Sequence, residues 1–107
     1  MKFKGVILAI PYFGYSRQDK RFKPGESISA RAIAEMLGSR CDGMVLLDLH
    51  APAVLSDMSI PVAFTSAMPE LAQHLKETVG PDFILSPDKG AIDRASSVAQ
   101  QIACEFS

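Results

Sequence analysis

Two short, unbroken apolar runs constrain the fold of this chain more than any other feature of its sequence. One covers residues 5–10 and stops at Pro11; the other covers residues 44–50 and has polar residues only at its carboxyl end. Continuous apolar runs of this length are typical of parallel strands that are covered on both faces. We therefore expect a central strand over 5–10 and a second buried strand over 44–50. Both runs are too short to cross a bilayer.

Apolar residues at helical spacing separate these strands and recur twice later in the chain. The expected helices run from Ser27, as N-cap, to Gly38, from Pro69 to Gly80, and over 92–102, with short strands over 61–64 and 82–86. The predicted order is β-α-β-(β)-α-β-α. Such alternation indicates an α/β fold with a mostly parallel sheet and flanking helices. The length of 107 residues fits one small domain.

Polar residues gather where three predicted strands end. They comprise the cluster over residues 17–21, then Asp48 with His50, and finally Asp88. Ligands of open α/β folds collect at the carboxyl ends of the strands, so these groups are candidates for one site. Because residues two apart on a strand share a face, Asp48 and His50 would point the same way. Each group also has a simpler interpretation: a solvated loop, a strand terminus, and a turn with Asp88 near a helix N-terminus.

The charge of the chain is unevenly distributed. The net charge is −1, yet the residues through Arg31 include seven Lys or Arg and only two Asp or Glu. This asymmetry favours an anionic ligand near the first third of the chain. The balanced total and the lack of interleaved aromatic residues argue against a nucleic-acid partner. Cys41 and Cys104 are widely spaced and no secretory leader is evident, so we expect reduced thiols, a cytoplasmic location and no membrane association.

The chemistry of the three polar groups is complementary. Arg17 and its cationic neighbours can hold phosphates, while a carboxylate beside an imidazole can hold a divalent ion that neutralises the same phosphates. Phosphoryl-type transfer relies on such positioning and electrostatics. Judged by ligand type alone, His50 would suggest zinc before magnesium, and the spacing does not decide between the two metals.

Several motifs occur together in a distinctive order. They are Ile10-Pro-Tyr-Phe-Gly-Tyr-Ser-Arg-Gln-Asp-Lys20, Lys23-Pro-Gly-Glu-Ser-Ile-Ser-Ala30, Asp48-Leu-His-Ala51, Ile60-Pro-Val62, Ala67-Met-Pro69 and Ser86-Pro-Asp-Lys-Gly90. Over nearly the whole chain, this pattern resembles the ribose-phosphate pyrophosphokinases, also called phosphoribosyl pyrophosphate synthetases. The residues that follow Asp88, Lys89-Gly-Ala91, are similar to those of the archaeal branch of that family.

The resemblance implies a Mg²⁺-dependent enzyme that moves the diphosphoryl group of ATP to ribose 5-phosphate, giving phosphoribosyl pyrophosphate and AMP. It implies that Arg17 and Gln18 contact ATP and that His50 lies beside both ATP and the metal. It also implies that Asp88 is a second magnesium-binding carboxylate, near the ribose 5-phosphate site, and that Asp48 assists through bound water.

The resemblance further implies an incomplete chain from a homo-oligomeric protein. Residues 1–65 would be the C-terminal part of one phosphoribosyltransferase-like domain, and residues 66–107 the N-terminal part of a second. The family's catalytic Lys/Arg loop and its Asp-Asp-x-x-x-Thr-Gly-Gly segment have no counterpart here. We therefore expect no catalytic residue in this chain and negligible activity for it alone.

Two other functional classes stay open. One is a non-catalytic nucleotide-binding protein or a regulatory partner of full-length synthetase. The other is a phosphate-binding α/β module unrelated to ribose chemistry. Binding of ATP without release of AMP would favour the first class, and competition by unrelated phosphates would favour the second.

Overall fold

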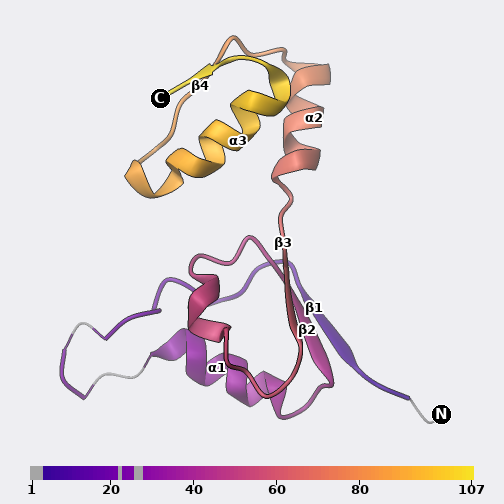
Figure 1. The fold of residues 1–107 in the computed structure, drawn as a ribbon, viewed down its shortest axis with the longest axis vertical. Helices are drawn as coiled ribbons and strands as arrows, with labels where there is room; N and C mark the ends of the chain where they lie inside the picture. Colours follow the sequence, from indigo (N-terminus) through magenta and orange to yellow (C-terminus); the bar gives the residue numbers. More distant parts are fainter. Residues whose placement is uncertain (1–3, 22, 26–27) are drawn as a thin grey trace. The chain divides into compact units, whose positions relative to one another are not determined.

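A three-stranded parallel sheet organises the first half of the chain in the computed structural model, which describes residues 4–21, 23–25 and 28–107. The strands are β1 (Ile7–Ile10), β2 (Gly43–Leu47) and β3 (Val62–Thr65), in the order β1-β2-β3. Figure 1 shows them side by side. In the register, Ile10 of β1 is paired with Leu46 of β2, which is in turn paired with Phe64 of β3. All three strands therefore end at the same edge of the sheet.

Helix α1 (Ser29–Gly38) and the 3₁₀ helix η1 (Pro52–Leu55) pack against one face of this sheet. Ala30 and Ala34 of α1 are fully buried, and these small side chains let the helix approach the strands closely. They share a core with Met44, Leu46 and Leu55, which are at most 2% exposed. The predicted N-cap, Ser27, lies outside the described residues, and the described helix begins at Ser29.

The second half of the chain pairs two helices with a minimal sheet. Helix α2 (Met68–Thr78) packs against α3 (Ile92–Ile102), which follows the short 3₁₀ helix η2 (Lys89–Ala91). The buried contact residues are small or β-branched: Ala72, Ala95, Val98 and Ala99. Strands β4 (Phe83–Ile84) and β5 (Glu105–Phe106) form a parallel pair. The sequence predicted a longer strand over 82–86 and did not predict β5.

The chain divides into two compact units, one ending at Thr65 and the other beginning at Ser66. The single domain expected from length is therefore wrong. The physical reason is that each half of the chain has its own parallel sheet and its own buried residues. That the units are parts of two phosphoribosyltransferase-like domains stays a prediction.

One face of the first sheet is largely uncovered, which corrects the expectation that the β1 strand is covered on both sides. Ile7 is 62% exposed and Ala9 is also exposed, whereas Leu8 and Ile10 on the opposite face pack against the core. The register places Val45 beside Ala9 on the same side. Within the described part of the first unit, α1 and η1 supply the helical cover, and both contribute to the core on the other face.

Among the described residues, no helix has the length and apolar character needed to span a membrane.

Candidate functional site

The cationic segment, residues 17–21, follows β1. Contacts before it and after it hold it to the rest of the first unit. After Pro11 the chain turns, and Phe13 enters the core with only 4% of its surface exposed. The backbone N–H of Gln18 donates to the carbonyl of Tyr15 at 2.9 Å, and the Ala30 N–H donates to the carbonyl of Gln18 at 3.2 Å. Burial of Phe13 and the bond to α1 therefore hold the segment that carries Arg17 close to the carboxyl edge of the sheet.

Three cationic side chains of this segment face solvent. Arg17, Lys20 and Arg21 are all exposed, and the ion pairs found within the described residues involve none of them. No carboxylate of the described residues forms an ion pair with these three cations. A guanidinium group presents a planar fork of donors that matches phosphate oxygens, so Arg17 is chemically suited to a phosphate. Gln18 is exposed beside it and can both donate and accept hydrogen bonds.

Arg31 contributes to the positive charge of the sequence but serves a different purpose. Its Nε donates to the Glu35 carboxylate at 2.6 Å, and its Nη1 donates to Asp57 and to the carbonyl of Val54. Hydrogen bonds to Asp57 and Glu35 raise the Arg31 pKa, and the Arg31 hydrogen bond lowers the pKa of Asp57. Arg31 therefore joins α1 to η1 and its charge is already paired.

The end of β2 departs from the predicted geometry. The strand ends at Leu47, and Asp48 adopts the left-handed region with φ 47°. Its N–H donates to the carbonyl of Thr65 at 2.9 Å. The rule that residues two apart share a face holds only within a strand, so it does not apply to Asp48 and His50. Leu49 between them is buried at 7%, while His50 is exposed and Asp48 is half-buried.

Asp88 lies in the second unit, in the turn that precedes α3. Its Oδ1 accepts a hydrogen bond from the Ala91 N–H at 3.0 Å, and the Ser86 hydroxyl donates to its backbone carbonyl at 2.5 Å. The simpler interpretation predicted this turn near a helix N-terminus, and the hydrogen bond to Ala91 shows in addition that Asp88 caps η2. Arg17, Gln18, Asp48 and His50 belong to the first unit, and Asp88 belongs to the second.

The candidate residues of the first unit offer few side chains that could bind a divalent ion. Among the described residues, no group of three or more His, Cys, Asp or Glu side chains is positioned to hold a metal. Asp48 and His50 alone offer one carboxylate and one imidazole. Magnesium commonly uses one or two protein ligands together with waters and substrate phosphates, so a complete ligand set around Asp48 or His50 would need such further groups.

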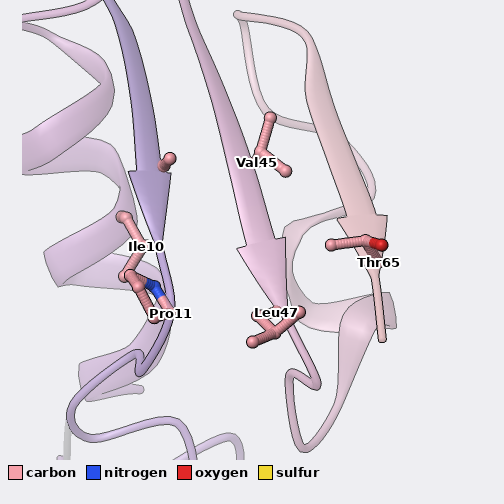
Figure 2. A pocket seen from close by; sticks show the side chains of 6 residues that line it. Ile10, Pro11, Val45, Leu47 and Thr65 are labelled. Atoms are coloured by element: carbon pink, nitrogen blue, oxygen red, sulfur yellow. The ribbon is translucent and has the colours of Figure 1, made fainter. Parts of the chain in front are cut away.

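A small apolar pocket lies at the carboxyl edge of the sheet (Figure 2). Its volume is about 180 Å³, and it is lined by the strand ends Ile10, Pro11, Leu47 and Thr65, together with Ala9 and Val45. Nucleotide and drug-sized ligands need roughly 300–1,000 Å³ and a few convergent polar groups. This pocket is therefore too small and too apolar to be a complete nucleotide site by itself.

Two residues near this edge were missed by the sequence interpretation. Thr65 ends β3 and lines the pocket, and a β-branched polar residue directly after an apolar run is a signal that could have marked it. Tyr15 has φ 62° and is 63% exposed. No feature of the sequence predicts that backbone conformation, because a left-handed turn would ordinarily favour Gly or Asn.

The first unit defines an open, parallel α/β protein whose exposed cationic segment follows a strand end. Comparison with known proteins shows which members of this large class the chain is similar to. Residues 2–40 match the family described as the N-terminal domain of ribose phosphate pyrophosphokinase. Over almost its whole length, this chain is similar to proteins named ribose-phosphate pyrophosphokinase, as its motifs predicted.

Named relatives and a solved structure support this assignment. The chain is 40% identical to the ribose-phosphate pyrophosphokinase of Methanopyrus kandleri over 94% of its own length and 35% of that protein. For the Pyrococcus abyssi protein the identity is also 40%, over 98% of this chain and 37% of the relative. The crystal structure of phosphoribosylpyrophosphate synthetase from Mycobacterium smegmatis matches with a TM-score of 0.83 and 29% identity, covering 96% of this chain and 36% of that one.

These matches confirm the mostly parallel fold with flanking helices. They also show that the chain spans little more than a third of the length of the relatives it matches.

Proposed function

We propose that this chain forms part of the nucleotide site of a ribose-phosphate diphosphokinase. In the complete protein, the diphosphoryl group of ATP would pass to the 1-hydroxyl of ribose 5-phosphate, giving phosphoribosyl pyrophosphate and AMP. The observation that carries the proposal is the exposed cationic segment at the carboxyl end of β1, which takes part in none of the ion pairs found among the described residues, in a chain 40% identical to relatives of that name. Cytoplasmic location and homo-oligomerisation of the complete protein belong to the same proposal.

Each candidate residue has a defined role in this proposal. Arg17 binds the phosphate oxygens of ATP, and Gln18 forms a hydrogen bond to the nucleotide. His50 and Asp48 hold a Mg²⁺ ion that accompanies the triphosphate, with Asp48 acting through a bound water. Asp88 is a second magnesium-binding carboxylate, near ribose 5-phosphate, and would use the oxygen that is not engaged with Ala91. The metal would neutralise phosphate charge while the protein groups orient the ligand.

We expect these 107 residues to bind ATP without turning it over. About two thirds of the length of the relatives has no counterpart in this chain. Loss of even one group that stabilises transition-state charge costs on the order of a hundredfold to a thousandfold in rate. Incubation with Mg²⁺, ATP and ribose 5-phosphate should therefore yield no AMP above a protein-free control. AMP release at rates typical of kinases would contradict this expectation.

Replacement of Arg17 tests the binding role. We expect Arg17→Ala to weaken Mg·ATP binding about tenfold or more, because charge-assisted hydrogen bonds to phosphate contribute roughly 1.5–3 kcal/mol. Isothermal titration of the purified chain with Mg·ATP measures the effect. Arg40→Ala is the matched control, since Arg40 is also exposed but follows the C-terminus of α1. Equal affinities for wild type and Arg17→Ala would contradict the proposed site.

A further inference from the structure

Side chains from all three strands form the open face of the first sheet, which lies opposite α1 and η1. The register pairs Ala9 with Val45 and Val45 with Ala63, and each strand alternates its side chains between the two faces. The open face therefore carries uncharged residues: Ile7, Ala9, Val45, Leu47, Ala63 and Thr65. A partner for this face needs an apolar surface rather than a charged one.

The order of the strands explains why this face is open. The strands β1, β2 and β3 follow one another across the sheet in a single direction. Crossovers between parallel strands are almost always right-handed, so two successive crossovers in one direction lie on the same face. Both α1 and η1 accordingly contribute to the core on one side. Within the described part of residues 4–65, no crossover covers the open face.

Ile7 is the protruding side chain of the open face. It lies at the amino end of β1, and 62% of its surface is exposed. Its side chain extends over Gly43 of β2, because a Cβ atom at Gly43 would lie only 3.0 Å from the Ile7 Cδ1. The missing side chain at Gly43 thus lets Ile7 stand over the central strand at the amino end of the sheet.

The hollow of the same face lies at the opposite, carboxyl end of the strands (Figure 2). All three strands contribute to its walls, with Ala9 from β1, Leu47 from β2 and Thr65 from β3. Its volume is about 180 Å³, and an apolar cavity of about 150 Å³ already holds a benzene molecule, so one Ile side chain fits. At about 3.3 Å per residue, Ile7 lies roughly 10 Å before the end of β1. The face therefore has a protrusion at one end and a hollow of matching size at the other.

We propose that the open face binds a second copy of this chain in a closed two-fold dimer, in which Ile7 of each copy enters the hollow of the other. A two-fold axis that runs across the strands, between the two sheets, lays each β2 over the other in the opposite direction. The protrusion then meets the hollow twice, as an isologous contact requires. Two sheets that pack face to face with nearly aligned strands are a common arrangement. This inference does not depend on the proposed nucleotide site.

The size of the oligomer distinguishes this contact from other kinds of association. A two-fold contact occupies the open face of both copies, so association should stop at the dimer. Pairing through the free edges of β1 or β3 would instead allow continued growth. Sedimentation velocity of the 107-residue chain over a concentration series should therefore show monomer and dimer only. A monomer at every concentration, or species larger than the dimer, would overturn the proposal.

Two variants with opposite charges test the fit between protrusion and hollow. Ile7→Lys places an ammonium group on the protrusion and Thr65→Asp places a carboxylate in the hollow, and both positions are exposed. Each variant alone should raise the dimer dissociation constant more than about tenfold, because a charge loses water without gaining a partner. An equal mixture of the two variants should dimerise again. In the mixed dimer the ammonium group of one copy meets the carboxylate of the other, and the second contact is native.

Leu71→Asp is the matched control for the carboxylate. Leu71 is 50% exposed on α2, in the second unit. This variant should dimerise as wild type does, and it should not draw fluorescently labelled Ile7→Lys chains into dimers. Circular dichroism shows whether each variant is folded, and Ala9→Asp, at the opposite wall of the hollow, replaces Thr65→Asp if that variant does not fold. Unchanged dimerisation of the folded hollow variant, or an equal mixture with Ile7→Lys that stays monomeric, would show that the protrusion does not enter the hollow.

Discussion

Arg31 illustrates how one side chain can connect elements that are distant in the sequence. It lies in α1, forms hydrogen bonds to Glu35 one turn later and to Asp57 just after η1, and also reaches the Val54 carbonyl inside η1. Exposed ion pairs contribute little to stability in general. This one is supported by a backbone acceptor and by two carboxylates, so it orients η1 on the helix that covers the sheet.

The first prediction concerns Asp57. The hydrogen bond from Arg31 lowers its pKa, so folding favours the ionised carboxylate. Its stabilising contribution is therefore present above the ordinary Asp pKa of about 4 and is lost as the pH falls through the lowered folded value. Asp57→Asn should lower the urea midpoint slightly at about pH 7, and the difference from wild type should shrink at about pH 3. Circular dichroism during urea titration measures both midpoints.

Asp82 provides the control for this measurement. It is an exposed carboxylate in the second unit, outside the Arg31 cluster. Asp82→Asn should leave the urea midpoint close to that of wild type at both pH values. A difference for Asp57→Asn that grows on acidification would contradict the assigned direction of the pKa shift.

At the scale of secondary-structure elements, the helices could be predicted better than the strand ends. The predicted helix from Pro69 to Gly80 is found as α2, because Pro suits a first helical turn and Gly80 accepts a left-handed φ of 61° just after the helix. These are local effects that a short stretch of sequence contains. The strand β5 was not predicted because two residues carry no periodic pattern and its partner, β4, lies far back along the chain.

In the candidate site, too, features set by neighbouring residues could be predicted from the sequence, whereas features set by contacts between distant residues could not. That Arg17 and Gln18 lie in an exposed loop after a strand could be predicted from composition and position. The left-handed backbone of Asp48 could not, because it accompanies a hydrogen bond from its N–H to Thr65, which is distant in the sequence. Predicting where His50 faces would have required knowing that the strand ends at Leu47.

The second prediction concerns the contact between β2 and α1. Leu46 is fully buried in the core that contains Ala30 and Ala34. Leu46→Ala should lower the free energy of unfolding by about 2–5 kcal/mol, because it removes buried apolar surface and leaves a cavity. Urea unfolding followed by circular dichroism measures the change. Leu71→Ala is the control, since Leu71 is 50% exposed on α2 and should cost much less; equal losses for both variants would contradict the assigned core.

At the scale of the whole molecule, each unit has its own sheet and its own buried residues, and the first unit leaves apolar surface uncovered. Parallel sheets in proteins are generally covered on both faces. Here α1 and η1 cover one face, whereas Ile7 and Ala9 on the other are exposed. The described sheet also has β1 and β3 at its edges, and unpaired strand edges can add further strands. Both features favour association with another chain.

The last prediction follows from this uncovered face. We expect the purified 107-residue chain to self-associate increasingly with concentration, a second copy covering apolar surface around Ile7. Ile7→Lys should shift the sedimentation profile toward the monomer, because a buried ammonium group without a partner is costly at such a contact. Leu71→Lys adds the same charge at another exposed apolar residue and should leave association unchanged. A wild-type chain that sediments as one monomeric species at every concentration, or equal effects of the two lysines, would show that this face does not drive association.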